Sequence, residues 1–358
     1  MSEHLPRSAL VPYVGAAAAS QVAIEPLGEG LINDTYLVRR QGATLPPAAD
    51  ATLAAVDRWV LQRVNPIFAP SVHEDIEAVT RHLLRRGLAT PLLYRTLDGA
   101  LAAQVDGSVW RMMTFVPGES PRVLSPARAF EAGRLVGRFH VALSDLTHTF
   151  RFSRPQAHDL RAHLLSLEQA LGQAATAPAG FHPLAEEVLE QARALPAQVP
   201  GPLRICHGDL KCNNIRFDPG GRALCLLDLD TLGQLPLCIE MGDALRSWCN
   251  AADEDHEEAL FDLEIFERAL AGYADSASGL LLPEEREGLV AGLFRIALEL
   301  AARFLTDVVQ DRYFRYDPQR FPSRAAHNLV RARGQLSLAR AVAAHRAEAE
   351  AIVARCLR

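Results

Sequence analysis

The chain changes character at Pro117-Gly118, and this change is the strongest constraint on its fold. Before it, segments rich in β-branched and aromatic residues predict strands, with one amphipathic helix over 71–86. After it, helical periodicity predominates. At 358 residues the chain is long enough for about two domains. We predict an α+β fold with a small β-rich lobe, residues 1–116, and a larger, mostly α-helical lobe, residues 117–358. The predicted strands are 22–26, 35–39, 59–64, 92–94, 100–104 and 109–115, and the later helices are 126–144, 157–174, 183–195, 260–274, 283–310 and 323–356.

Charge and hydropathy exclude two classes of partner. The chain has 37 Lys+Arg against 43 Asp+Glu, a formal net charge of −6, and no long basic run. We therefore expect no nucleic-acid partner, because such binding requires phosphate neutralisation. The most apolar long segment, 288–305, carries Arg295, Glu299 and Arg303 at helical spacing. Charges at that spacing are costly in lipid, so we expect a buried helix and no membrane partner.

The termini and cysteines favour a cytoplasmic protein. An Ala-rich run after Arg7 is similar to a signal peptide, but Pro12 interrupts it and strand-like sequence follows at once. The cysteines form no C-x-x-C pair, which argues against a zinc ribbon and favours buried free thiols in a reducing compartment. They are Cys206, Cys212, Cys225, Cys238, Cys249 and Cys356.

One strand-like island, 203–230, interrupts the helical region and carries the residues best suited to chemistry. It reads I-C-H-G-D-L-K-C-N-N-I-R-F-D and then L-C-L-L-D-L-D-T. Asp209 lies in a tight loop, Asn214 follows five residues later, and Asp228 ends an apolar run that predicts a buried strand. Phosphoryl transfer needs a carboxylate to accept the hydroxyl proton, oxygen ligands for Mg²⁺, and a cation near the transferred phosphate. The island offers each of these.

Lys211 is the only lysine in the chain, and the other 36 basic residues are arginines. A codon bias explains the arginines but not the position of the lysine, two residues after Asp209. There a cation would meet the transferred phosphate. We expect His207, by contrast, to brace the loop through hydrogen bonds rather than to take part in catalysis.

The H-G-D-x-x-x-x-N pattern resembles the Brenner motif of the aminoglycoside phosphotransferase and choline kinase superfamily. It is also similar to the H-R-D-x-K-x-x-N catalytic loop of eukaryotic protein kinases. The resemblance implies a protein-kinase-like fold with ATP and Mg²⁺ as cofactors. It implies that Asp209 is the catalytic base, that Lys211 contacts the γ-phosphate, and that Asn214 and Asp228 hold the metal. Asp230 is a second candidate for the metal.

Other segments extend the resemblance. Asp243, in M-G-D-A-L-R, resembles the later aspartate that steadies the catalytic loop. L-G-E-G-L-I-N-D-T-Y, with Gly28 and Gly30, resembles the loop that covers the nucleotide, where glycines let backbone N–H groups approach phosphates. T-F-V-P-G, with Thr114 and Val116, would be the hinge whose backbone meets adenine.

The lysine that most kinases carry on the third strand is absent. Gln62 or Arg63 must therefore bind the phosphates, or that contact does not exist. Arg63 is suited to bidentate phosphate binding, and Glu77 in the following helix would orient it.

Several motifs together look most like the N-acetylhexosamine 1-kinase family. They are I-N-D-T-Y, W-V-L-Q-R-V-N, H-G-D-L-K-C-N-N, L-D-L-D-T and R-F-L-T-D-V-V-Q-D-R-Y-F, within about residues 25–316. Members of that family phosphorylate the anomeric hydroxyl of N-acetylgalactosamine or N-acetylglucosamine with ATP. Arg303, in the last motif, would donate to sugar oxygens. The alternative is a helix arginine paired with Glu299 or Asp307 at four-residue spacing.

Two further hypotheses remain open. The same fold would also serve another small acceptor, such as an aminoglycoside or other antibiotic, an amino alcohol or another sugar. A pseudokinase that binds ligands without chemistry is disfavoured, because Asp209, Asn214 and Asp228 are all present.

Overall fold

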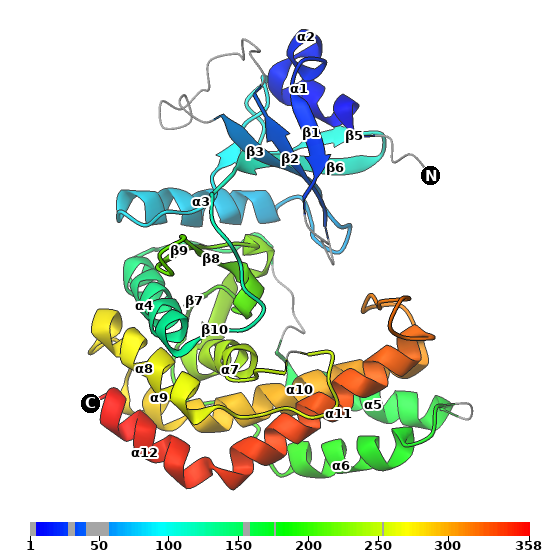
Figure 1. The fold of residues 1–358 in the computed structure, drawn as a ribbon, viewed down its shortest axis with the longest axis vertical. Helices are drawn as coiled ribbons and strands as arrows, with labels where there is room; N and C mark the ends of the chain where they lie inside the picture. Colours follow the sequence, from blue (N-terminus) through cyan, green and yellow to red (C-terminus); the bar gives the residue numbers. More distant parts are fainter. Residues whose placement is uncertain (1–4, 28–32, 41–56, 153–157, 175–176, 253) are drawn as a thin grey trace. The chain divides into compact units, whose positions relative to one another are not determined.

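The computed structural model describes residues 5–27, 33–40, 57–152, 158–174, 177–252 and 254–358 (Figure 1). Contacts divide the chain into two compact units. Unit 1 comprises residues 1–117 and 145–153, and unit 2 comprises residues 118–144 and 154–358. The second stretch of unit 1 lies beyond the boundary drawn at residue 116 from the sequence.

Unit 1 is built on a six-stranded antiparallel sheet in the order β1-β2-β3-β6-β4, with β5 paired to β6. Every strand predicted in this region is present, with bounds shifted by up to three residues. The strands are β1 (Ala23–Pro26), β2 (Asp34–Arg39), β3 (Arg58–Arg63), β4 (Leu93–Tyr94), β5 (Ala103–Val105) and β6 (Ser108–Thr114).

Three short helical turns pack against one face of this sheet: η1 (Arg7–Leu10), α1 (Val11–Val14) and α2 (Ala16–Ala19). The sequence did not predict them, because turns of four residues are too short to show helical periodicity. Tyr13 is fully buried beside Trp59 and Leu61, and its hydroxyl donates to the carbonyl of Trp110 at 2.6 Å. The Ala-rich run therefore contributes some of its alanines, Ala9, Ala18 and Ala19, to the hydrophobic core.

Helix α3 (Val72–Arg85) fastens the returning stretch of unit 1. Asp75, in its first turn, is 1% exposed. Its carboxylate accepts hydrogen bonds from the backbone N–H of Arg151 at 2.9 Å and of Phe152 at 2.8 Å. His148 contacts the same carboxylate through Nε2 at 2.7 Å. One buried side chain thus holds residues 148–152 against the helix.

Unit 2 is mostly helical and contains two small antiparallel sheets. One sheet pairs β7 (Leu203–Cys206) with β10 (Gly233–Pro236), and the other pairs β8 (Ile215–Phe217) with β9 (Ala223–Leu226). The predicted helix over 283–310 is divided at Gly288, and the one over 323–356 is divided at His345. The helices are α4 (Pro126–Leu143), α5 (Leu160–Gln173), α6 (Phe181–Arg193), α7 (Leu237–Trp248), α8 (Leu263–Ala277), α9 (Pro283–Glu287), α10 (Leu289–Gln310), α11 (Arg324–Ala344) and α12 (Arg346–Cys356).

Helix α7 is at the centre of unit 2, and every residue in it except Ser247 is buried. It crosses α10 with direct backbone contact. A Cβ added to Gly242 would lie 2.7 Å from the backbone of Gly292, and one added to Gly292 would lie 2.1 Å from the carbonyl oxygen of Cys238. These two glycines therefore permit the close crossing that places α10 beside α7.

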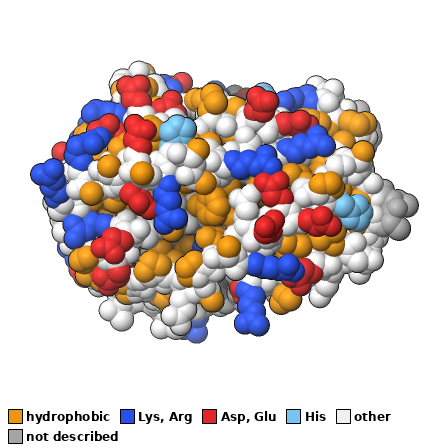
Figure 2. All heavy atoms as spheres, turned by 90° about the horizontal axis from the view of Figure 1, so that it is seen from below, with side chains coloured by type: hydrophobic (Ala, Val, Ile, Leu, Met, Phe, Trp, Pro, Cys, Tyr) orange, Lys and Arg blue, Asp and Glu red, His pale blue; other side chains and the backbone are white. Residues whose placement is uncertain are grey.

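Helix α10 matches the expected buried helix with a polar edge. Most of its residues are buried, whereas Arg295 and Arg303 are partly exposed. Among the described residues, no helix is long and apolar enough to cross a membrane. Figure 2 shows that acidic and basic side chains are interspersed over the face seen from below in Figure 1.

Candidate active site

The island predicted from the sequence forms a tight loop between β7 and β8. The loop begins at His207, passes through Gly208, and ends in a 3-10 turn, η3 (Cys212–Asn214). Gly208 has φ +79°, and a Cβ there would lie 2.4 Å from the carbonyl oxygen of Thr231. Glycine is required for both reasons, since a side chain would be strained and would clash with the backbone.

Glu240 of α7 braces the start of this loop. Its carboxylate accepts the backbone N–H of His207 at 2.7 Å and that of Gly208 at 2.9 Å, and His140 Nε2 lies 3.4 Å away. The His207 ring is fully buried and contacts the carbonyl of Leu227 through Nε2 at 2.8 Å. His207 is therefore structural, as expected. Glu240 was missed, because α7 was not predicted.

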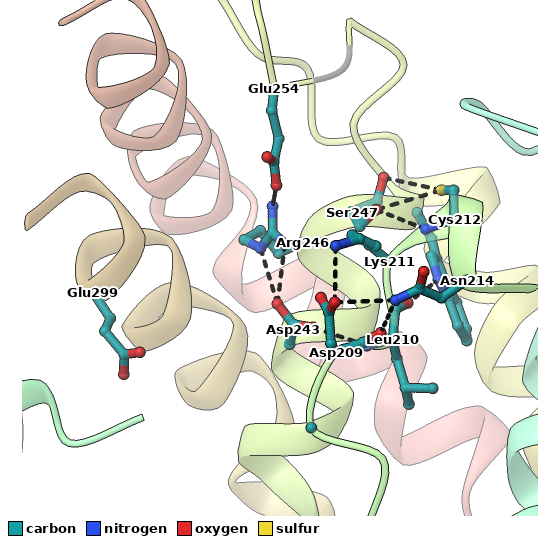
Figure 3. Close-up of polar contacts among 12 residues, drawn as sticks. Asp209, Leu210, Lys211, Cys212, Asn214, Asp243, Arg246, Ser247, Glu254 and Glu299 are labelled. Atoms are coloured by element: carbon teal, nitrogen blue, oxygen red, sulfur yellow. Dashed lines mark hydrogen bonds and ion pairs between the residues drawn. The ribbon is translucent and has the colours of Figure 1, made fainter. Parts of the chain in front are cut away.

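Asp243, one turn later on α7, braces the middle of the loop. It accepts the backbone N–H of Leu210 at 3.0 Å and the guanidinium of Arg246 at 3.0 Å (Figure 3). Arg246 also donates to Glu254 at 2.5 Å. The prediction that Asp243 steadies the loop is confirmed. A chain of alternating charges supports it, which is buried at Asp243 and Arg246 and partly exposed at Glu254.

Asp209, Lys211 and Asn214 are brought together within the loop (Figure 3). The Lys211 ammonium donates to Asp209 Oδ2 at 2.8 Å, and the Asn214 amide donates to the same oxygen at 3.0 Å. The Asp209 side chain is 23% exposed. Burial opposes its ionisation, but the Lys211 charge more than offsets this and holds the pKa of Asp209 below its ordinary value. Asp209 is therefore an ionised carboxylate with an accessible edge at neutral pH.

The charge of Lys211 is fixed by surrounding carboxylates. Burial disfavours the ammonium, but Asp209, Asp228 and then Glu254 raise the pKa of Lys211 above its ordinary value. A lysine that is always protonated acts as a cation and not as a base.

Asp228 follows β9 and precedes the 3-10 turn η4 (Leu229–Thr231). It has φ +60° and is partly exposed, whereas Asp230 is fully buried. Partial exposure favours Asp228 over Asp230 as a ligand for an incoming ion. The side-chain nitrogen of Asn214 donates to Asp209, so the amide oxygen of Asn214 faces away from Asp209. Carboxylate and amide oxygens are the ligands that Mg²⁺ prefers, so this donor set fits that ion.

The residues predicted to bind nucleotide belong to unit 1. Gly28 and Gly30 lie outside the described residues. Thr114 ends β6, where its hydroxyl accepts the backbone N–H of Leu92 at 3.0 Å, and Val116 follows just before the unit ends.

The predicted pairing of Arg63 with Glu77 is wrong. Arg63 Nε donates to Asp34 at 2.7 Å, because the two residues are directly opposed across β2 and β3. Glu77 instead accepts hydrogen bonds from Arg81 at 3.2 Å and Arg95 at 2.9 Å.

Gln62 and Arg63 lie on opposite faces of the sheet, because successive strand residues alternate. Gln62 accepts a hydrogen bond from Arg111 at 2.9 Å and donates to Thr35 at 3.1 Å. Arg111 lies opposite Gln62 on β6 and is 1% exposed. Sequence reasoning missed this buried arginine, because the strand register that places it there is not visible in the sequence.

Arg303 of α10 has no ion pair or hydrogen bond among the described residues. Its guanidinium lies 5.8 Å from the ring centre of Tyr313 and 5.7 Å from that of Phe314. Glu299 contacts His158 at 3.2 Å, and Asp307 accepts backbone N–H groups. The alternative of a helix arginine paired at four-residue spacing is therefore not found.

Comparisons with known proteins find curated kinases that are similar to this chain. The chain is 28% identical to the homoserine kinase of Bradyrhizobium sp. (strain BTAi1 / ATCC BAA-1182) over 173 residues. These residues cover 48% of this chain and 51% of that protein. It thus matches about half the length of that curated relative. The homoserine kinase of Chelativorans sp. (strain BNC1) is 26% identical over 252 residues, which cover 70% of this chain and 68% of that one.

Solved structures and a family model extend the similarity. Plasmodium vivax ethanolamine kinase superposes with a TM-score of 0.60 at 12% identity, over 92% of this chain and 85% of that one. The ADP-bound aminoglycoside phosphotransferase APH(2'')-Ib superposes with a TM-score of 0.51 at 13% identity, over 87% and 94%. These neighbours share the two-lobed, protein-kinase-like fold. The model of the phosphotransferase enzyme family matches residues 23–277. The chain therefore belongs to the phosphotransferase enzyme family, and it shares its fold with solved ethanolamine kinase and aminoglycoside phosphotransferase structures.

Proposed function

We propose that the chain is an ATP- and Mg²⁺-dependent kinase that transfers the γ-phosphate to the anomeric 1-hydroxyl of an N-acetylhexosamine, in the cytoplasm. Asp209 would accept the proton of the hydroxyl as its oxygen attacks the phosphorus, and Lys211 would offset charge on the transferred phosphoryl group. An anomeric hydroxyl is more acidic than an ordinary alcohol, so an ionised carboxylate with a lowered pKa still suffices as the base.

Asn214 and Asp228 would hold Mg²⁺, which would orient the phosphates of ATP and neutralise part of their charge. In unit 1, Gly28 and Gly30 would approach the phosphates, and Thr114 and Val116 would meet the adenine. Arg63 remains the proposed partner of the phosphates and would leave Asp34 to reach them. The ADP-bound state of a structural neighbour, APH(2'')-Ib, supports nucleotide use.

The observation that carries the choice of acceptor is the guanidinium of Arg303, which contacts two aromatic rings but makes no hydrogen bond or ion pair within the described part of the chain. It can donate to hydroxyl or acetamide oxygens. Of the carboxylates on α7 and α10, Asp243 pairs with Arg246 and Asp307 accepts backbone N–H groups. Glu299 contacts His158 through Oε1, and its buried Oε2 has no hydrogen-bond partner among the described residues. The free oxygen of Glu299 is buried, whereas the Arg303 guanidinium is partly exposed, so an incoming acceptor meets a donor first. This balance supports a neutral sugar over an amino alcohol or an aminoglycoside.

Homoserine is a second candidate, because curated relatives at 26–28% identity are named homoserine kinase. Its carboxylate would suit Arg303, but its ammonium would need an acidic partner. The test is to incubate the purified protein with ATP, Mg²⁺ and each of N-acetylgalactosamine, N-acetylglucosamine, homoserine, ethanolamine and an aminoglycoside. Phosphorus NMR would then locate the phosphate. A sugar 1-phosphate is the expected product, and turnover of homoserine alone would refute the sugar assignment.

A further inference from the structure

Helix α10 places Glu299, Arg303 and Asp307 four residues apart, so they share one stripe of the helix. The glycine crossing described above seats α10 on α7, which holds the catalytic loop through Asp243. His158 links the same groups, since its pKa responds to Glu299, Asp243 and Arg303 together. Helix α10, which carries the stripe, is therefore held directly against α7.

The carboxylate of Asp307 has no free position at which it could accept a hydrogen bond from Arg303. It is 2% exposed. Its Oδ1 accepts the backbone N–H of Arg312 at 3.0 Å and of Tyr313 at 2.8 Å. Its Oδ2 accepts the backbone N–H of Phe314 at 2.9 Å and the amide of Asn328 at 2.9 Å. A carboxylate offers about four acceptor positions, and all of them are used here.

The loop that Asp307 fastens carries the rings that flank Arg303. Tyr313 and Phe314 follow directly in this loop, which is the orange segment after α10 in Figure 1. The ring centres of Phe314 and of Phe304 on α10 lie 4.5 Å apart, so the loop also packs against α10. Arg331 of α11 donates to the carbonyl of Arg315 at 2.9 Å. The loop is thus held by contacts from both helices.

We propose that Asp307 is a positioning residue for the acceptor site. By fixing the backbone of residues 312–314, it holds the two aromatic rings that orient the Arg303 fork before the acceptor binds. A guanidinium already held in place loses less freedom on binding, which strengthens the interaction with the acceptor. The inference rests on the proposed function in one respect, that Arg303 contacts the acceptor.

The test is Asp307→Asn, which keeps the size of the side chain but turns an amide N–H₂ toward backbone N–H donors. We expect the KM for the acceptor to rise roughly ten- to hundredfold, because small misplacements of a binding group are costly. The KM for ATP should change by less than about twofold, since the change lies on the acceptor side. An acceptor KM within twofold of wild type, in a variant shown to be folded by circular dichroism, would overturn the proposal.

Two controls separate positioning from general stability. Asp262→Asn weakens the N-cap of α8, where Asp262 accepts the backbone N–H of Ile265 at 3.0 Å, and should lower the Tm without raising the acceptor KM. Arg303→Lys completes a double-mutant cycle. If Asp307 acts through Arg303, the two effects on acceptor KM are strongly non-additive, and additive effects would count against it.

Asn328→Ala decides the matter if Asp307→Asn does not fold. Asn328 is fully buried, and its amide holds Oδ2 of Asp307 at 2.9 Å. Without this bond the carboxylate is freer to turn, so it fixes the backbone of residues 312–314 less firmly. We expect an acceptor KM about fivefold higher, equivalent to one hydrogen bond, and an unchanged value would overturn the proposal. The wild-type acceptor panel is read first, so failure of the sugar assignment is seen without any variant. If the wild type uses homoserine, the same comparison is made with homoserine.

Discussion

The buried pair of His158 and Glu299 should make the stability of the protein fall between about pH 6.5 and 9. Burial of the imidazole opposes its protonation, but the Glu299 carboxylate at 3.2 Å, with a smaller contribution from Asp243, more than offsets this. Arg303 opposes protonation weakly. Together, these interactions raise the pKa of His158 from 6.5 to about 9. His158 is therefore an imidazolium at neutral pH.

A raised pKa means that the folded state holds the proton more tightly than the unfolded state does. One pKa unit corresponds to about 1.4 kcal/mol, so the pair contributes at most roughly 3 kcal/mol. The contribution is complete below pH 6.5, where His158 is protonated in both states. It declines as the pH rises toward 9 and is absent above that value. The His158 side chain is only 10% exposed, so solvent screening reduces it little.

The perturbation is Glu299→Gln, which removes the charge and keeps the shape. The assay is urea unfolding at intervals from pH 6 to pH 9.5, followed by circular dichroism. The free energy of unfolding of the wild type should fall through this window by as much as about 3 kcal/mol more than that of the variant. Glu267→Gln is the control, because Glu267 pairs on the surface with Arg355, which does not titrate in this range. Parallel curves for the wild type and Glu299→Gln would refute the reasoning.

Other predictions concern the catalytic loop. Asp209→Asn should lower kcat by about 10²- to 10⁴-fold while ATP still binds, as measured by calorimetry; near-normal turnover would remove Asp209 from the role of base. Lys211→Arg should also lower kcat strongly, because a planar guanidinium does not replace a compact ammonium that donates to Asp209. An unchanged kcat would mean that the lysine at position 211 has no catalytic significance. Glu240→Gln should cost about 1–3 kcal/mol in chemical denaturation, since one of two buried N–H groups loses its acceptor. Gly208→Ala should cost about 1–3 kcal/mol from its backbone conformation alone, and an unchanged Tm would contradict this.

The elements that could be predicted from the sequence are those with contrast between their faces. Strand β3 alternates partly exposed and buried positions, and helix α3 buries one face. The bounds of both were predicted to within a few residues. Helix α7 is buried on nearly all sides, its charged residues Glu240, Asp243 and Arg246 included, so its burial does not follow the polarity of its sequence. The division of 323–356 at His345 carries no glycine or proline to mark it.

In the candidate site, residues that are close in sequence could be predicted, and partners from distant elements could not. Asp209, Lys211 and Asn214 are close in sequence and were grouped correctly, because a short loop brings them together whatever the rest of the chain does. Partners supplied by distant elements were missed or misassigned. Glu240 lies on the unpredicted helix, and Arg63 meets Asp34 through a strand register that the sequence does not display.

The return of residues 145–153 to unit 1 bears on how this protein can be divided. The chain passes between the units three times, after residues 117, 144 and 153. A fragment that stops at residue 116 or 117 would leave Asp75 without the two backbone donors that it engages in the intact protein. The N-terminal unit is therefore not a portable module, and chimeras that exchange it between related enzymes must transplant the distant stretch as well.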